Sequence, residues 1–255
     1  MRNSIKLLQV MAFCLIALNL YACKRNQLPH SGTRAHNELH GIVNDGKTTN
    51  EIVLFNDINS FQTKLRFPPE ISVVVETLGW NAPEQPTLIR KGYANNARIG
   101  LDLTKKMQLV PKKSIAEDQL LGGLGVQFSA NGGIPTPEYI EANFKESIAN
   151  TRPFEDKPEL KLREYTQLTA NGDISGYLYV PLDKNIKGFE GEKILIGCHV
   201  GGAKSLNNQR PSSCASHIRR AGGLSVTYSF DSGLLPYWHE ILSEINNVTD
   251  RLVVQ

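Results

Sequence analysis

An apolar run from Leu7 to Ala22, closed by Cys23, is the feature that most constrains this chain. Arg2 and Lys6 precede the run, and this charged-then-apolar order is typical of a secretory signal peptide. Sixteen residues at about 1.5 Å each span roughly 24 Å, less than the ~30 Å hydrocarbon core that a membrane helix must cross. We therefore expect residues 1–22 to be removed on export, so that the remainder folds in an oxidising compartment.

The residues around the expected cut are Leu20, Tyr21, Ala22 and Cys23, which resemble the lipobox of bacterial lipoproteins. The resemblance implies that Cys23 becomes the lipidated first residue and anchors the chain to the envelope, facing the periplasm, at the outer membrane. Tyr21 departs from the smaller residue usual at its position. The alternative is an ordinary signal peptide that leaves a cysteine behind, although Leu20 fits poorly the small residue such a cut prefers.

The cysteine count agrees with lipidation. Cys14 leaves with the signal, so the mature chain holds Cys23, Cys198 and Cys214, an odd number for an oxidising compartment. If Cys23 carries a lipid, Cys198 and Cys214 remain to pair. Their disulfide would close a segment of about 17 residues and stabilise the fold by about 3 kcal/mol in a chain-entropy treatment.

Metal binding is the alternative at two places in the sequence. His199 and His217 lie near the two cysteines, but neither cysteine has the C-x-x-C spacing that zinc sites use. His30, His36 and His40 fall in a segment that we expect to be an unpacked linker. We therefore predict no metal site and no cofactor.

Charge argues against nucleic-acid binding. The whole chain has a formal charge of +3, and loss of Arg2 and Lys6 leaves 26 basic and 25 acidic side chains, or +1. No basic stripe interleaved with aromatic residues occurs, so the electrostatic footprint of a nucleic-acid-binding protein is missing. A hydrophobic content of 40% is sufficient for a core.

The mature chain divides into a tether and two lobes. Residues 23–50 are polar and lack apolar periodicity, so we expect a lipidated cysteine followed by a flexible tether. Residues 51–152 form the first predicted lobe, which is rich in strand signals. Its expected strands are 52–55, 61–67, 71–78, 87–89, 99–103 and 124–128. Thr136 and Pro137 then predict the start of a helix that ends before Pro153.

Residues 153–255 form the second predicted lobe and repeat this order. Strands 160–168 and 174–182 flank a turn with Asn171 and Gly172, which predicts a hairpin. Strands 193–200 and 224–230 follow, separated by a polar loop, and an apolar stripe predicts a terminal helix over 236–252. The expected fold class is α+β, with each lobe a mostly antiparallel sheet followed by a helix.

Catalytic motifs are absent from the sequence. No G-x-S-x-G string occurs, and His239-Glu240 cannot start H-E-x-x-H because Ser243 replaces the second histidine. The glycine-rich stretch 122–125 lacks the G-K-[ST] of a phosphate-binding loop. Ser205 or Ser212 could still meet His199 and Asp231 in space, so a hydrolase remains an alternative. We predict a protein without catalytic residues.

The polar loop Gly201–Gly223 is the candidate partner-binding segment. Loops of this length inside compact domains are usually functional or disordered, and a Cys198–Cys214 disulfide would restrain this one. Its basic and hydrogen-bonding residues are Lys204, Asn207, Asn208, Gln209, Arg210, His217, Arg219 and Arg220. A solvated loop held by a disulfide for stability alone is the alternative.

The stretch Ile196–Leu252 resembles lipoproteins that protect bacteria against toxic effectors of contact-dependent secretion, including type VI lipases. The shared order is a strand ending in Cys198, a polar loop with Cys214, the strand 224–230, and a helix opened by Leu235, Trp238 and Ile241. The resemblance implies an immunity protein that binds and neutralises a secreted protein toxin, such as a lipase, and contacts the membrane only through its anchor. An envelope assembly lipoprotein is the first alternative, and a periplasmic hydrolase is the second.

Overall fold

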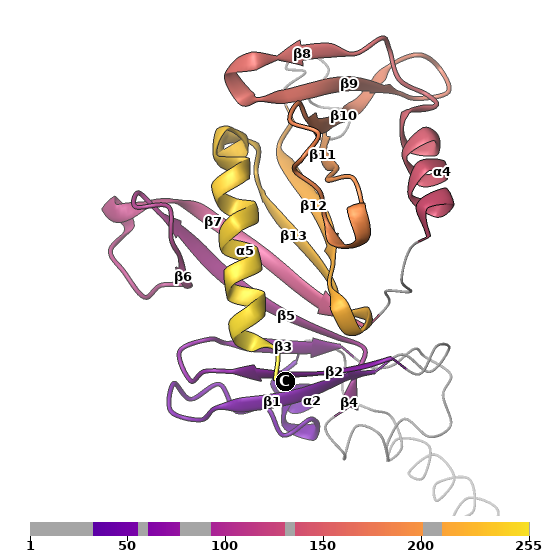
Figure 1. Cartoon of the computed structure of the whole chain (residues 1–255). Coiled ribbons are helices and arrows are strands. Elements are labelled where there is room, and N and C mark those ends of the chain that lie inside the picture. The colour runs from indigo at the N-terminus through magenta and orange to yellow at the C-terminus, as the bar shows by residue number, and fades with distance from the viewer. Residues whose placement is uncertain (1–32, 56–60, 77–92, 131–135, 201–210, 255) are drawn as a thin grey trace, which may run out of the picture.

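The computed structural model describes residues 33–55, 61–76, 93–130, 136–200 and 211–254. The helices within these ranges are α2 (Arg34–Leu39), α4 (Pro137–Ile148) and α5 (Trp238–Leu252) (Figure 1). The short 3-10 helices are η1 (Glu117–Gln119), η2 (Pro158–Leu160), η3 (Phe189–Gly191), η4 (Ala221–Gly223) and η5 (Ser232–Tyr237). The strands are β1 (Asn50–Phe55), β2 (Gln62–Phe67), β3 (Val73–Glu76), β4 (Tyr93–Ala94), β5 (Asn96–Thr104), β6 (Leu109–Pro111), β7 (Leu120–Ser129), β8 (Glu155–Lys157), β9 (Leu162–Leu168), β10 (Ile174–Pro181), β11 (Ile196–His199), β12 (Ser213–Arg219) and β13 (Ser225–Asp231).

The described strands form two sheets. A three-stranded sheet has the order β2-β1-β4, in which β1 and β4 are parallel. A ten-stranded sheet has the order β3-β5-β7-β13-β12-β11-β10-β9-β8, with β6 added to β5, and all its pairs are antiparallel. The predicted α+β class with mostly antiparallel strands is therefore confirmed.

The predicted boundary at residue 152 falls between α4 and β8 and does not divide the large sheet. Strand β7 lies before that boundary and β13 lies after it, yet the two pair from Ser129↔Ser225 to Leu124↔Phe230. Strands from both predicted lobes thus share one sheet. Whether the two halves form separate domains stays a prediction.

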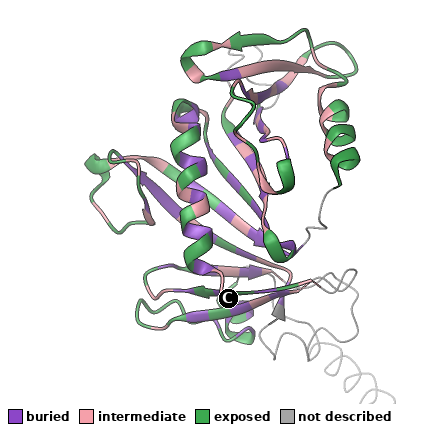
Figure 2. Cartoon of the chain, viewed as in Figure 1, coloured by how far each residue is buried: buried purple, intermediate pink, exposed green. Residues whose placement is uncertain are grey.

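The core lies on one face of the large sheet, and both α5 and the three-stranded sheet contribute buried side chains to it. Leu101, Leu124, Phe230, Cys214 and Cys198 are directly opposite one another across five successive strands, and all are buried. The apolar stripe of α5 covers them, with Trp238, Ile241, Ile245, Val248 and Leu252 buried (Figure 2). Burial of such side chains supplies most of the stabilisation, at about 25 cal/mol for each Å² of apolar surface removed from water.

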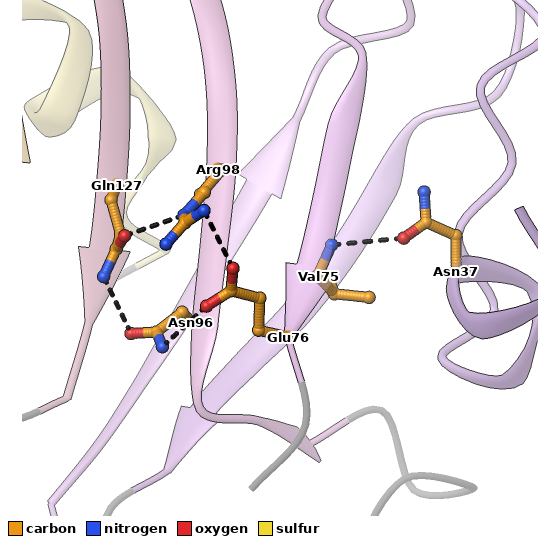
Figure 3. A network of polar contacts seen from close by, with 6 residues as sticks. All are labelled: Asn37, Val75, Glu76, Asn96, Arg98 and Gln127. Atoms are coloured by element: carbon orange, nitrogen blue, oxygen red, sulfur yellow. Dashed lines mark hydrogen bonds and ion pairs between the residues drawn. The ribbon is translucent and has the colours of Figure 1, made fainter. Parts of the chain in front are cut away.

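The opposite face of the large sheet is polar where β3, β5 and β7 pair. Four side chains from β3, β5 and β7 close a ring of contacts there (Figure 3). Arg98 Nε donates to Gln127 Oε1 at 2.7 Å, and Gln127 Nε2 donates to Asn96 Oδ1 at 3.3 Å. Glu76 completes the ring by accepting from Asn96 and pairing with Arg98 at 2.9 Å. At this end of the sheet, apolar residues face the core and polar residues face away from it, as expected for a one-sided antiparallel sheet. At the other end, the opposite face also carries an apolar side chain, because Leu178 on β10 lies opposite Gly197 and is buried.

Local sequence signals place several elements where we expect them. Thr136 caps α4, because its Oγ1 accepts a hydrogen bond from the Tyr139 amide. Strands β9 and β10 pair as the predicted hairpin, and Gly172 in its turn has a φ of +83°, which suits glycine. The expected strand 87–89 lies outside the described residues.

The prediction of a flexible tether is wrong for residues 33–50. Thr33 caps α2 by accepting from the His36 amide, and Asn37 from this helix is buried against β3. Asn37 Nδ2 donates to the Val73 carbonyl at 3.0 Å, and Asn37 Oδ1 accepts from the Val75 amide at 3.1 Å. Asn44 adds two more bonds to Val73. Polar composition concealed this packing, because side-chain amides rather than apolar residues cover the edge of β3.

The prediction of a long unstructured loop over 201–223 is wrong for its second half. Residues 213–219 form β12, an interior strand of the large sheet. Its buried side chains are Cys214, Ser216 and Ile218, of which only Ile218 is a strong apolar signal, so the alternation was not visible in the sequence. No helix in the described part of the chain is both long and apolar enough to cross a membrane.

Candidate binding surface

The predicted loop residues fall into two groups. Lys204, Asn207, Asn208, Gln209 and Arg210 lie outside the described residues. His217 and Arg219 lie on β12, on the face away from the core, and Arg220 follows that strand directly. The structure therefore places two of the predicted residues on an interior strand and the third directly after it, rather than on a loop.

The predicted disulfide between Cys198 and Cys214 is confirmed. The two residues are directly opposite in the β11–β12 pair, with their Cα atoms 4.0 Å apart. Both are buried, so the bond is part of the core beneath α5. It joins the strand that leads into the undescribed residues 201–210 to the strand that carries Arg219.

Arg219 and Arg220 line a cavity of about 390 Å³, which we call the β12 cavity. Lys187 lines it from the segment between β10 and β11, and Ile218 and Leu242 contribute apolar lining. No acidic side chain is part of this lining, so three cations give the described lining a formal charge of +3.

A second cavity of about 400 Å³ adjoins the first, and we call it the α4 cavity. The two share Lys187 and Ile194. Helix α4 contributes Phe144, and β9 contributes Arg163 and Tyr165. Lys184 and Lys193 bring its cations to four with Lys187, against the single acid Asp183, for a formal charge of +3.

Ion pairs neutralise four of the six cations around the two cavities. Arg163 binds Asp156 through two bonds of 2.7 and 3.1 Å, and Lys193 binds Glu141 at 3.1 Å. Arg219 pairs with Glu192, and Arg220 pairs with Asp250.

Lys184 and Lys187 have no ion-pair partner among the described residues. Both are exposed, and Asp183 beside them accepts a hydrogen bond from the Asn185 amide instead. The charges of this surface without an ion pair in the described chain are therefore these two lysines and the single carboxylate of Asp183, a net charge of +1.

Aromatic rings contact three of the four paired cations. The Arg163 guanidinium lies 3.9 Å from the centroid of the Phe154 ring, and Lys193 Nζ lies 3.6 Å from that of Phe144. Arg219 lies 5.2 Å from the Tyr139 ring. Each exposed cation–π contact contributes about 0.5–1 kcal/mol and restricts the side chain. These contacts restrict Arg163 and Lys193 in the lining of the α4 cavity and Arg219 in that of the β12 cavity.

Burial shifts the pKa values of two groups beside the β12 cavity. Burial raises the pKa of the Glu192 carboxyl, and the nearby Arg219 charge opposes this rise. Burial lowers the pKa of Arg220, which still carries its charge at neutral pH because a guanidinium ordinarily titrates above 12. At the other end of the surface, Arg163 lowers the pKa of Asp156 by hydrogen bonding to it.

The third predicted residue, His217, does not line either cavity. Its Nε2 contacts the hydroxyl of Ser225, and burial followed by the Arg219 charge lowers its pKa. A serine next to a histidine is the start of a nucleophilic pair. However, Ser225 is only 5% exposed, and the charged group that acts on His217 is a cation rather than an orienting carboxylate. This pair is better explained as part of the sheet than as a hydrolase site.

The serine–histidine–acid group considered from the sequence is only partly assembled. Ser205 lies outside the described residues, while the Ser212 amide donates to the His199 carbonyl at 3.2 Å. Asp231 instead accepts from the Gly233 amide at 2.7 Å. Among the described residues, the side chains of Ser212, His199 and Asp231 share no hydrogen bond.

No group of three or more metal-ligating side chains occurs within the described ranges. His36 and His40 are buried with their ring centroids 4.8 Å apart, and His30 lies outside those ranges. Burial lowers the pKa of His36.

The cations of the α4 cavity were missed from the sequence. Arg163 is on β9, Lys184 and Lys187 follow β10, and Lys193 precedes β11. The only local signal was the cluster of lysines between residues 184 and 193, which reads equally well as a solvated loop.

No family model matches this sequence, and no curated protein matches it. Among solved structures, the chain is similar to Smlt3025, described as an immunity protein of the Stenotrophomonas maltophilia type IV secretion system. The match covers 82% of this chain and 99% of that chain, at 12% sequence identity and a TM-score of 0.22. A TM-score of 0.22 carries no argument about a shared fold or function.

Proposed function

We propose that this protein is an immunity protein that binds a secreted toxic effector and neutralises it. The observation that carries the proposal is the surface formed by the α4 and β12 cavities. It joins two adjoining cavities, ordered aromatic–cation contacts and two exposed lysines without an ion-pair partner in the described chain. Such a surface suits recognition of another macromolecule, because contacts within the protein restrict its paired cations and two of its lysines have no ion-pair partner in the described chain.

We further propose that the protein works in the bacterial periplasm as a lipoprotein anchored through Cys23, at the outer membrane. The signal-like residues 1–22 and the Cys198–Cys214 disulfide support this location, since disulfides persist in oxidising compartments. The finer proposal for the toxin is a lipase of a type VI or similar contact-dependent system, supported by the sequence resemblance of Ile196–Leu252. Blocking a toxin requires no catalytic group on the immunity protein.

The test is rescue from a toxin encoded beside the gene for this protein. Cells that export the toxin to the periplasm should die without this protein and survive when it is co-expressed. A matched control expresses the same toxin in the cytoplasm, where an exported immunity protein gives no protection. Survival that does not depend on this protein would overturn the proposal. An envelope defect on deletion without any toxin would instead favour the assembly lipoprotein.

A further inference from the structure

We propose that the α4 cavity receives an acidic segment of the toxin, with one large apolar side chain in the cavity and carboxylates against Lys184 and Lys187. This inference rests on the proposed function and names the chemistry of the partner. It commits to a protein segment as the occupant. The charge and the apolar lining of the cavity both match such a segment.

The cations that line the α4 cavity differ in whether they already have an ion-pair partner. Of the four cations that line the cavity, Arg163 and Lys193 already bind Asp156 and Glu141. Lys184 and Lys187 are exposed and have no carboxylate partner among the described residues, so they are the two charges available to a partner. A partner that brings carboxylates to this position forms new ion pairs without breaking existing ones.

The α4 cavity also has an apolar lining. The apolar residues Leu182, Ile186 and Ile194 line the same cavity as the lysines, and the rings of Phe144 and Tyr165 are edge to face with their centroids 6.4 Å apart. A volume of about 400 Å³ is at the lower end of ligand sites and is large enough for one or two peptide side chains. An acidic segment with a tryptophan or another large apolar residue therefore fits both the charge and the lining.

Helix α4 forms one wall of the α4 cavity through Phe144. None of its residues is buried, and Tyr139 is 50% exposed. Two cations of the surface attach it to the sheet, because Lys193 contacts Glu141 and Phe144 while Arg219 contacts Tyr139. Figure 2 shows the exposed and intermediate residues along this helix. The wall is held by the same cation–aromatic contacts that order the cavity, so it is in position when the segment arrives.

The experiment measures binding of labelled peptides to the purified protein by fluorescence anisotropy. The probe is a nine-residue synthetic peptide of Asp and Glu around a central Trp. One control peptide replaces the acids with Lys, and another replaces the Trp with Ala. The acidic Trp peptide should bind best, and high salt should weaken its binding because the lysines are exposed.

The variant pair is K184E/K187E and its control K105E/K106E. Lys105 and Lys106 are exposed in the turn between β5 and β6, outside both cavities, so the control changes the net charge equally. K184E/K187E should weaken peptide binding on the order of tenfold, because each exposed ion pair changes an equilibrium constant by up to roughly fivefold. K105E/K106E should bind the peptide like the unmodified protein.

Equal binding of acidic and basic peptides, or unchanged binding by K184E/K187E, would overturn the inference. Binding of phosphatidylglycerol vesicles through Lys184 and Lys187 in place of the peptide would overturn it in favour of a membrane contact. If K184E/K187E still protects cells fully, this site is refuted while the immunity function stands. If no toxin is neutralised but the acidic peptide binds through the two lysines, the immunity function fails and recognition of an acidic segment stands.

Discussion

Substitution of Asn37 by alanine should destabilise the protein strongly, because this side chain occupies the free edge of β3. Strand β3 is the terminal strand of the large sheet, and the Asn37 amide bonds to Val73 and Val75 as a neighbouring strand would (Figure 3 shows the Val75 bond). The Val73 carbonyl still accepts a hydrogen bond from Asn44 at 2.8 Å in the variant. Loss of its bond from Asn37 therefore costs only about 0.5–1.5 kcal/mol. The Val75 amide loses its acceptor in a fully buried position, which costs about 1–3 kcal/mol.

The expected total is about 2–4 kcal/mol in the free energy of unfolding, read from urea unfolding with circular dichroism. The matched control is Asn247→Ala on α5, where an exposed Asn donates to Glu244 at 2.9 Å within the same helix. That change should cost less than about 0.5 kcal/mol. A cost below about 1 kcal/mol for Asn37→Ala, or an equal cost for the two variants, would refute the conclusion that Asn37 of α2 stabilises the fold by bonding to the free edge of β3.

Three further predictions concern the disulfide, pH and the anchor. The double change Cys198→Ala with Cys214→Ala should cost about 3 kcal/mol in urea unfolding, and reduction of the unmodified protein should lower its stability to the same level. Burial lowers the pKa values of His36 and His217 from 6.5, so the unfolded chain binds more protons and stability should fall below about pH 6.5. The free energy of unfolding should change with pH by at most about 1.4 kcal/mol per pH unit for each histidine, and H36Q/H217Q should reduce this slope. An unchanged slope in that variant would show that the two histidines are not its cause. Cys23→Ser should move the protein from the membrane to the soluble fraction, and unchanged membrane retention would count against lipidation.

Elements with strong local signals were predictable from the sequence. A capping hydroxyl followed by proline predicts the start of α4, and the Asn171-Gly172 turn predicts the β9–β10 hairpin. The α5 stripe is visible because its buried residues repeat with the period of a helix. In each case the residues that decide the structure are close together in the sequence.

Elements that depend on distant partners were not predictable. Asn37 bonds to the edge of β3 through Val73 and Val75, which are 36 and 38 residues away in the sequence but lie beside it in the fold. Strand β12 buries a cysteine and a serine, so its burial shows only once β11 and β13 flank it. The α4 cavity is likewise lined by residues from α4, β9 and the segment between β10 and β11. The spacing of these residues in the sequence does not predict that they lie close together.

The disulfide also decides which side chains reach the binding surface. A shift of β12 by one residue would exchange its two faces, sending Arg219 into the core and Ile218 to the surface. Small and polar residues along β12 specify the register weakly, since only Ile218 among its buried residues is strongly apolar. Cys198 and Cys214 can bond only when they lie opposite each other, which is the register that directs Arg219 toward Glu192 and the β12 cavity. The covalent bond thus links the oxidising compartment that we propose to the position of Arg219, which lines the β12 cavity beside the surface that we propose to bind the toxin.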